Sequence, residues 1–203
     1  MFHDSLFAPP GGEPTEVLPY DLSAVIHRGA IAQSDEMMAA LLETLPWQSR
    51  QIRIFGRWVD EPRLSSWHGD DGTAYRYSGI TLQPQPWTPE LSAIKHICEN
   101  LSGSPLNSVL ANLYRNGRDA MGWHSDDEPE LGPEPVIASV SLGATRRFDL
   151  RHRVTKETVQ VHLGPGDLLV MSQSSQRSWM HQVPRTAKVN QPRINLTFRQ
   201  ILV

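Results

Sequence analysis

Residues 136–152 read VIASVSLGATRRFDLRH, two short apolar, strand-like runs on either side of a turn at Gly143. Segments of the same character occur on both sides, at 108–115, 157–163, 167–172 and 193–201. No segment with the length and periodicity of a helix lies between them. This part of the chain therefore predicts a mainly β fold, either a β-sandwich or a small barrel.

Two amphipathic helices are predicted before these strands. Ser34 fits an N-cap followed by acidic residues, and Pro46 ends the pattern that it begins. A second helix is predicted from Thr88 or Pro89 to about Leu101. The expected apolar stripes are Met37, Leu41, Leu42 and Leu45 in the first helix, and Leu91, Ile94, Ile97 and Cys98 in the second. We expect both helices to flank one sheet.

The composition fits a single globular domain, with 203 residues and 39% hydrophobic content. PPGGEP at positions 9–14 and the lack of apolar periodicity around it predict a disordered tail over residues 1–16, followed by one domain over 17–203. The chain has one cysteine, no long apolar run and no positively charged leader. These features favour a cytoplasmic protein with no membrane segment and no intramolecular disulfide.

The net charge of −3 is unevenly distributed. Residues 1–49 contain seven acidic residues and one basic residue, which leaves 18 basic and 15 acidic residues in the remainder of the chain. From Arg177 to the C-terminus there are five basic residues and no acidic one. This distribution is compatible with a phosphate-binding surface but does not demonstrate one.

The most acidic short run is WHSDDE at 123–128. It could be a solvated acidic turn, as most short charge runs are. Alternatively, if this run is a strand, His124 and Asp126 point to the same face and can share a metal ion. His181, in the segment RSWMHQVPR, is the candidate for a third ligand. Two histidines and one carboxylate leave half of an octahedral iron sphere open for a cosubstrate and oxygen.

The segment RINLTFR at 193–199 alternates polar and apolar residues. Its polar face carries Arg193, Asn195, Thr197 and Arg199, and it either faces solvent or lines an anion-binding cavity. Arginine suits the second role because its planar guanidinium pairs bidentately with a carboxylate. Asn112 and Tyr114 share a face of another predicted strand and could contact the same ligand. A dicarboxylate that chelates iron at its keto-acid end would use such residues.

These segments together resemble the AlkB family of iron(II)- and 2-oxoglutarate-dependent dioxygenases, most closely its members that repair duplex DNA. The resemblance rests on NxYxxGxDxMGWHSDDE, IASVSLGATRRFDLR, GDLLVM, SWMHQVP and PRINLTFR, and it covers roughly residues 50–201. It implies a double-stranded β-helix, or jelly-roll, core. It also implies Fe(II) bound by His124, Asp126 and His181, with O2 as co-reactant. The implied 2-oxoglutarate pocket consists of Arg193, which pairs with the distal carboxylate, and Asn112, Tyr114, Asn195 and Arg199.

The implied reaction is oxidative demethylation of bases such as 1-methyladenine and 3-methylcytosine, with release of formaldehyde. A flipped base is read on its pairing edge and stacked between rings. The family pattern assigns base contacts to Tyr75 and Tyr77, although cross-strand aromatic packing would explain them equally well. By similarity, Glu128 accepts a hydrogen bond from the exocyclic amine of the base. Asp127 is expected to fix an arginine such as Arg193.

The segment RQIRIFGRWVDEPR at 50–63 bears on the form of the substrate. Phe55 lies between two arginines and before a glycine, which suits an apolar wedge beside phosphate contacts, although a core phenylalanine is the commoner explanation. Duplex-repair members of the family have a finger residue in a similar setting, and Arg63 also matches their pattern. We therefore expect a nucleotide-recognition lid around residues 50–80 and alkylated DNA as the partner.

Two alternatives remain open. The same chemistry could act on RNA, a protein or a small molecule, and the acidic net charge mildly favours this. The chain could also be a non-catalytic module that binds nucleic acid or 2-oxoglutarate. The presence of all three ligand types and both arginines disfavours such a decayed site. We expect the protein to be a monomer.

Overall fold

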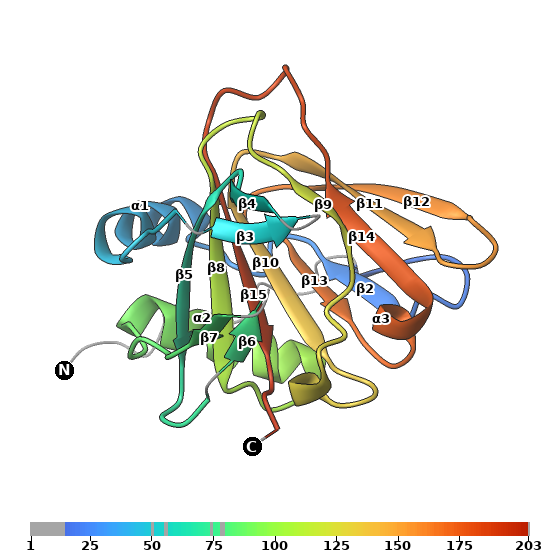
Figure 1. Ribbon diagram of the computed structural model, residues 1–203, viewed down its shortest axis with the longest axis horizontal. Coiled ribbons are helices and arrows are strands. Elements are labelled where there is room, and N and C mark those ends of the chain that lie inside the picture. Colours follow the sequence, from blue (N-terminus) through green and yellow to red (C-terminus); the bar gives the residue numbers. More distant parts are fainter. Residues whose placement is uncertain (1–14, 50, 55–56, 74, 78–79, 203) are drawn as a thin grey trace.

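The computed structural model describes residues 15–202 apart from residues 50, 55–56, 74 and 78–79. Two antiparallel sheets form the centre of the molecule (Figure 1). The larger contains, in spatial order, β1 (Thr15–Val17), β2 (Ala24–His27), β13 (Leu168–Met171), β10 (Ile137–Gly143), β15 (Arg193–Arg199), β8 (Ser108–Tyr114) and β5 (Leu64–Gly69). The smaller contains β12 (Thr158–Leu163), β11 (Arg146–His152), β14 (Trp179–Val183) and β9 (Met121–His124). This arrangement confirms the predicted mainly β fold with a jelly-roll core.

The core strands lie where the sequence pattern predicts them. The strand-like segments of the sequence correspond to β8, β10, β11, β12, β13 and β15. Gly143 ends β10 and begins the predicted turn into β11. Its φ of 78° is a backbone conformation that residues with a Cβ rarely adopt. The pattern did not predict β9 and β14, which are short and carry few β-branched residues.

Two helices, α1 (Ser34–Thr44) and α2 (Pro89–Ser102), pack against the larger sheet (Figure 1). In α2 the prediction is confirmed: Thr88 Oγ1 caps the helix by accepting from Leu91 N at 3.2 Å. In α1 the predicted cap is wrong, because Ser34 is the first helical residue and the cap position, Gln33, makes no side-chain capping bond. The predicted stripe of α1 is confirmed at Leu41 and Leu45, which are buried, and at Met37, which is partly buried against the core. Leu42 is exposed and Met38, which was not predicted, is buried.

The alternation in β15 places two kinds of surface on opposite faces of the larger sheet. Ile194, Leu196 and Phe198 pack with the helices in one apolar cluster. The opposite, polar face of β15 is also buried, so of the two interpretations of RINLTFR the solvent-exposed one is wrong. Burying this many polar groups is favourable only where they have partners, which indicates a functional interior.

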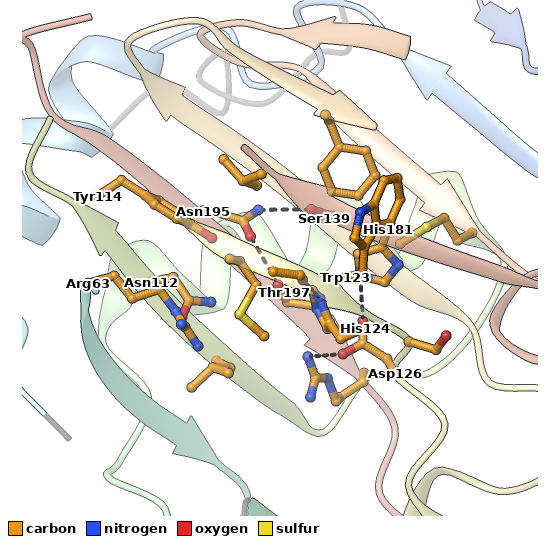
Figure 2. A pocket seen from close by; sticks show the side chains of 18 of the residues that line it. Arg63, Asn112, Tyr114, Trp123, His124, Asp126, Ser139, His181, Asn195 and Thr197 are labelled. Atoms are coloured by element: carbon orange, nitrogen blue, oxygen red, sulfur yellow. Dashed lines mark hydrogen bonds and ion pairs between the residues drawn. The ribbon is translucent and has the colours of Figure 1, made fainter. Parts of the chain in front are cut away.

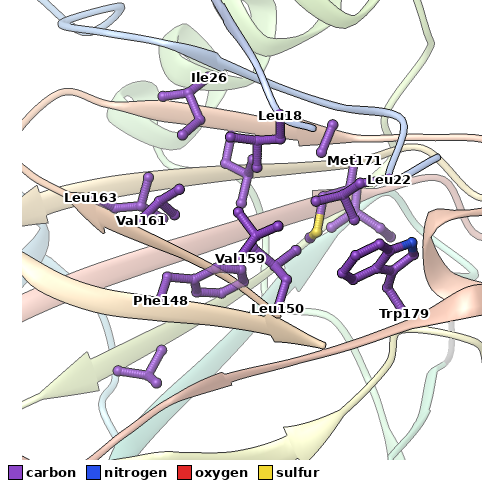
Figure 3. Packing of buried hydrophobic residues seen from close by; sticks show 14 of the residues in the cluster. Leu18, Leu22, Ile26, Phe148, Leu150, Val159, Val161, Leu163, Met171 and Trp179 are labelled. Carbon is purple, nitrogen blue, oxygen red and sulfur yellow. The ribbon is translucent and has the colours of Figure 1, made fainter. Parts of the chain in front are cut away.

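A second apolar cluster fills part of the space between the two sheets (Figure 3). Phe148 and Leu150 of β11 and Val159 of β12 pack there with Met171 of β13 and with Trp179, the first residue of β14. This cluster fixes the smaller sheet against the larger one and thereby sets the distance between residues that the two sheets contribute to the interior.

Two hairpins and two short helices complete the described chain. The hairpins are β3 (Gln51–Ile54) with β4 (Arg57–Asp60), and β6 (Tyr75–Tyr77) with β7 (Ile80–Leu82). Both fall within the segment predicted to form a lid. The short helices are η1 (Pro129–Leu131) and α3 (Ser175–Ser178). Thr15 and Glu16, which the sequence pattern assigned to the tail, belong to β1, whereas residues 1–14 lie outside the described part of the chain.

Within the described ranges, the helices are all too short or too polar to cross a membrane.

Candidate metal centre and adjoining pocket

Two histidines far apart in the sequence meet across neighbouring strands. His124, the last residue of β9, and His181, in β14, are register partners, and their ring centroids lie 4.2 Å apart. Asp126 lies two residues beyond the end of β9, in a loop and not in the strand as the predicted geometry required. The structure nevertheless brings the three predicted residues together, with candidate ligand atoms within 4.8 Å of one another.

The surroundings of these side chains favour the protonation states that a metal ion requires. Burial, with a further contribution from His124, lowers the pKa of His181 to about 3, so its imidazole is neutral at physiological pH. Burial alone would raise the pKa of Asp126, but the nearby Arg199 guanidinium holds it below the usual value. His124 Nδ1 lies 2.8 Å from Gly122 O, an arrangement that leaves Nε2 free to bind a metal.

Two imidazoles and one carboxylate on one side of an open space form the donor set that suits Fe(II) with vacant positions. Phe148 stacks on His181, with ring centroids 5.2 Å apart and an interplanar angle of 22°. This contact fixes the plane of the His181 ring. The residues present therefore fit an iron ion.

A pocket of about 370 Å³ opens beside the three residues. Its polar lining comes mainly from β8 and β15 of the larger sheet, and the histidines come from the smaller sheet. Figure 2 shows His124, Asp126 and His181 towards one end of the pocket, and Arg63, Asn112 and Tyr114 towards the other. The pocket is thus long enough to hold an extended ligand that reaches from the metal position to the far end.

The floor of the pocket is a hydrogen-bonded polar network. Asn195 Nδ2 donates to Ser139 Oγ at 2.8 Å and to Val140 O at 3.0 Å, and Thr197 Oγ1 donates to Asn195 Oδ1 at 3.3 Å. Because Asn195 and Thr197 have these partners, their side chains are held in fixed orientations before any ligand binds. Asn112 is similarly fixed, since its Oδ1 accepts from Arg63 Nε at 2.6 Å.

Arg193 lies behind Tyr114 and is not itself one of the lining residues. Its guanidinium carbon is 5.3 Å from the centroid of the Tyr114 ring, and Nη2 donates to Ser141 Oγ at 2.8 Å. Its Nε and Nη1 are buried and have no hydrogen-bond partner among the described residues. Burial lowers the pKa of Arg193 to about 10, which leaves the group cationic at neutral pH. Such a buried cation with unused donors indicates a place for an anion.

The predicted substrate residues have different outcomes. Glu128 lines the pocket, and its buried Oε2 has no hydrogen-bond partner among the described residues. Arg63 also lines the pocket, but it is buried, bonded to Asn112 and paired with Glu61 at 3.3 Å. Asp127 pairs with an arginine, as expected, but the partner is Arg153, at 2.9 Å, and not Arg193, and both side chains are exposed.

Three predicted contacts cannot be compared with the structure. Phe55 lies outside the described residues, and Tyr75 and Tyr77 are described only as the two ends of β6.

Sequence reasoning missed several residues of the site. Trp123, in the quoted run WHSDDE, lines the pocket and stacks with Arg151, whose guanidinium carbon is 4.4 Å from its ring. Met121 and Met171 also contribute to the lining. Trp123 and Met121 belong to the run MGWHSDDE, close to the predicted ligand His124, and this position could have indicated that they line the site. Ser139 offered none, because a serine within an apolar strand is common.

Comparison with known proteins places these observations in context. The family model for the 2OG-Fe(II) oxygenase superfamily matches residues 23–199. Human alpha-ketoglutarate-dependent dioxygenase alkB homolog 3 is 39% identical over 181 residues, which are 84% of this chain and 63% of the relative. Mouse DNA oxidative demethylase ALKBH2 is 43% identical over 161 residues, 75% of this chain and 67% of the relative. The chain therefore spans somewhat less than two thirds of the first of these relatives.

A solved structure, described as the structure of OsALKBH1, has the same fold. The TM-score is 0.62 at 18% sequence identity, and the match covers 92% of this chain and all of the other. At that identity the similarity bears on the fold alone, and it agrees with the jelly-roll core.

Proposed function

Since the chain belongs to the AlkB family within the 2OG-Fe(II) oxygenase superfamily, we propose that it demethylates N-alkylated bases in DNA and so reverses alkylation damage directly. The observation that carries this proposal is the meeting of His124, Asp126 and His181 beside a polar pocket, with the buried Arg193 against the lining residue Tyr114. The metal set alone would fit many oxygenases. The pocket beyond it and the similarity to the mouse and human proteins named DNA oxidative demethylase ALKBH2 support the finer assignment.

In this proposal, His124, Asp126 and His181 hold Fe(II). Asn112, Tyr114, Asn195, Arg193 and Arg199 bind 2-oxoglutarate. Arg193 is well suited to the distal carboxylate because it is buried, cationic and has two unused donors. With Fe(II), 2-oxoglutarate and O2 bound, the site supplies the oxidant that hydroxylates an N-methyl carbon, yielding succinate and carbon dioxide, and the hydroxymethyl group then leaves as formaldehyde.

The substrate lies on the side of the metal that Glu128 and Trp123 line. The unpartnered Oε2 of Glu128 can accept a hydrogen bond from the exocyclic amine of adenine or cytosine. A carboxylate also favours 1-methyladenine and 3-methylcytosine over neutral lesions, because methylation at these nitrogens gives the base a positive charge. Lid residues Phe55, Tyr75 and Tyr77 and the pocket residue Arg63 remain proposed contacts with the nucleic acid.

A panel assay tests the choice of substrate. Oligonucleotides carrying 1-methyladenine, 3-methylcytosine or an etheno adduct are offered as single-stranded DNA, duplex DNA and RNA. The loss of oligonucleotide mass is measured for every lesion, and released formaldehyde for the two methylated bases, because the two-carbon etheno bridge cannot leave as formaldehyde. We expect repair of the two cationic methylated bases in DNA. Repair of RNA at a clearly higher rate than of every DNA substrate would assign the protein to RNA, and turnover of 2-oxoglutarate without a change in the mass of any oligonucleotide would point to a different substrate class.

A further inference from the structure

The loop that carries Asp126 is attached to the turn that leads into the strand of His181. The backbone N–H of Asp126 donates to Gln176 Oε1 at 2.9 Å. Gln176 belongs to α3, and α3 continues directly into β14, where His181 lies five residues after Gln176. The short helix α3 thus contacts the Asp126 loop through the Gln176 side chain, and it leads directly into β14, which carries the second candidate ligand, His181.

The Gln176 side chain is fully buried and its amide is used at both ends. It is 1% exposed, and in addition to accepting from Asp126 its Nε2 donates to Met171 Sδ at 3.5 Å. Met171 is buried in the apolar cluster between the sheets and lines the pocket. These two contacts fix which end of the amide faces Asp126. A flipped amide would present its NH2 group to the Asp126 N–H, which is itself a donor, and its oxygen to the Met171 sulfur.

The contacts that Arg153 makes with this loop are more exposed than the Gln176 bond. Arg153 Nη2 donates to Ser125 Oγ at 2.7 Å and to Asp127 Oδ2 at 2.9 Å, but both charged side chains of the Arg153–Asp127 pair are more than one third exposed. Solvent-exposed ion pairs contribute little because water competes for both partners. A buried hydrogen bond has a larger effect when one partner is removed, since the other is left without water. Gln176 is therefore a stronger constraint than Arg153, and its bond is made to the backbone of Asp126, whereas buried Arg199 contacts the Asp126 carboxylate.

We propose that Gln176 is a positioning residue that sets the affinity of the site for its divalent metal by fixing the backbone of Asp126. This inference rests on the proposed metal centre. Holding the N–H of Asp126 fixes the direction in which its carboxylate leaves the loop, and the same turn fixes the start of β14 and hence His181. A loop that is free to rotate at Asp126 would have to be ordered again each time the metal binds.

The test compares Gln176→Met with Ser175→Ala in the full chain. Methionine has nearly the length of glutamine, but its thioether sulfur is a much weaker hydrogen-bond acceptor than the amide oxygen. Ser175 is the matched control, because it is the neighbouring residue in α3, is equally buried, and its Oγ has no hydrogen-bond partner among the described residues. Co(II) binding is followed by its visible absorption, and thermal unfolding monitors the fold.

We expect Gln176→Met to weaken Co(II) binding about ten- to a hundredfold, the usual effect of removing a group that orients a metal ligand. Ser175→Ala should bind Co(II) like the parent. Equal affinity of the parent and Gln176→Met, or equal weakening by both variants, would overturn the proposal. If the parent itself failed to bind Co(II), the metal centre and this inference would both be wrong.

A second measurement, hydrogen exchange, gives one result in the parent that does not depend on the variant folding. In the metal-free parent, the Asp126 amide should be protected from hydrogen exchange, and Gln176→Met should speed its exchange more than that of buried amides in β10. An Asp126 amide in the parent that exchanges as fast as an exposed one would exclude the anchor, whatever the metal data show.

Discussion

Arg199 Nη2 lies 3.3 Å from Asp126 Oδ1, and both side chains are almost completely buried. Arg199 is the last residue of β15 in the larger sheet, whereas Asp126 lies in the loop after β9 of the smaller one. The pair therefore connects the two sheets at the candidate metal centre. It also keeps the Asp126 carboxylate ionised in a site where burial alone would favour the neutral acid.

The first prediction concerns Asp126. Replacing it by Ala should abolish turnover of 2-oxoglutarate and leave the secondary structure intact, but it also leaves Arg199 without this buried carboxylate. Asp126→Asn is the matched variant, since it keeps the size and an oxygen for Arg199 while removing the negative charge that a metal needs. Both variants should produce no succinate above background and retain the circular dichroism spectrum of the parent. Succinate formation at the parent rate would exclude Asp126 as a ligand.

Arg193→Lys tests the far end of the pocket. Lysine keeps the charge but loses the planar pair of donors, and a charge-assisted hydrogen bond contributes about 1.5–3 kcal/mol. The 2-oxoglutarate concentration needed for half-maximal rate should rise about ten- to a hundredfold. Arg147→Lys, at a half-exposed arginine outside the pocket, is the control and should show no such rise. An unchanged requirement in Arg193→Lys would place this residue outside the cosubstrate site.

The pKa of His181 predicts how the stability of the metal-free protein depends on pH. The folded-state pKa is about 3 and the ordinary value is 6.5, so between these values the unfolded chain takes up a proton that the folded chain does not. The stability that the neutral imidazole provides is complete above pH 6.5 and is lost as the pH falls towards 3. One such group changes the free energy of unfolding by at most about 1.4 kcal/mol per pH unit.

Urea unfolding at several pH values between about 6 and about 4.5 measures this slope. His181→Gln should make it shallower, because glutamine does not titrate. His68, which is also buried and has a lowered pKa, remains in both proteins and contributes equally to both slopes. Identical slopes in parent and variant would mean that His181 is accessible to protons in the folded state.

Phe55 is predicted to contact the nucleic acid. Phe55→Ala should hardly change the melting temperature, strongly lower repair of a methylated base in duplex DNA, and lower repair in single strands much less, because an unpaired base needs no replacement in the stack. The stability control is Phe198→Ala, which truncates a fully buried side chain and should cost about 3–5 kcal/mol. A comparable loss of stability in Phe55→Ala, or an equal loss of repair activity on duplex and single-stranded DNA, would mean that Phe55 is a core residue and not a contact with the nucleic acid.

The sequence predicted the core strands because their burial follows local patterns. In β15 the alternation of polar and apolar residues is complete, and the structure turns its two faces to the pocket and to the helices. The metal residues were found through residue type and a family resemblance, but the geometric reason for Asp126 was wrong. Its placement depends on the loop after β9 and on contacts with Gln176 and Arg199, which no local pattern encodes.

Contacts between distant segments account for the other differences. Asp127 pairs with Arg153 because β9 and β11 flank the same strand, β14, and this neighbourhood is a property of sheet order. In α1, the exposure of Leu42 and the burial of Met38 reflect how that helix docks on β10, which propensity does not determine. The sequence thus predicted which residues matter better than it predicted how they are held.

If the protein demethylates DNA, the mass of an oligonucleotide that carries one methylated base must fall by the mass that the methyl group adds. A DNA oligonucleotide with one 1-methyladenine is incubated in air with the protein, Fe(II) and 2-oxoglutarate. Its intact mass is then measured by mass spectrometry, and Asp126→Asn is the matched control. We expect conversion of the oligonucleotide to its unmodified mass, with one succinate and one formaldehyde formed per methyl group lost. We expect no conversion by Asp126→Asn or without 2-oxoglutarate. An unchanged mass while the protein consumes 2-oxoglutarate, or equal conversion by Asp126→Asn, would contradict the proposed function.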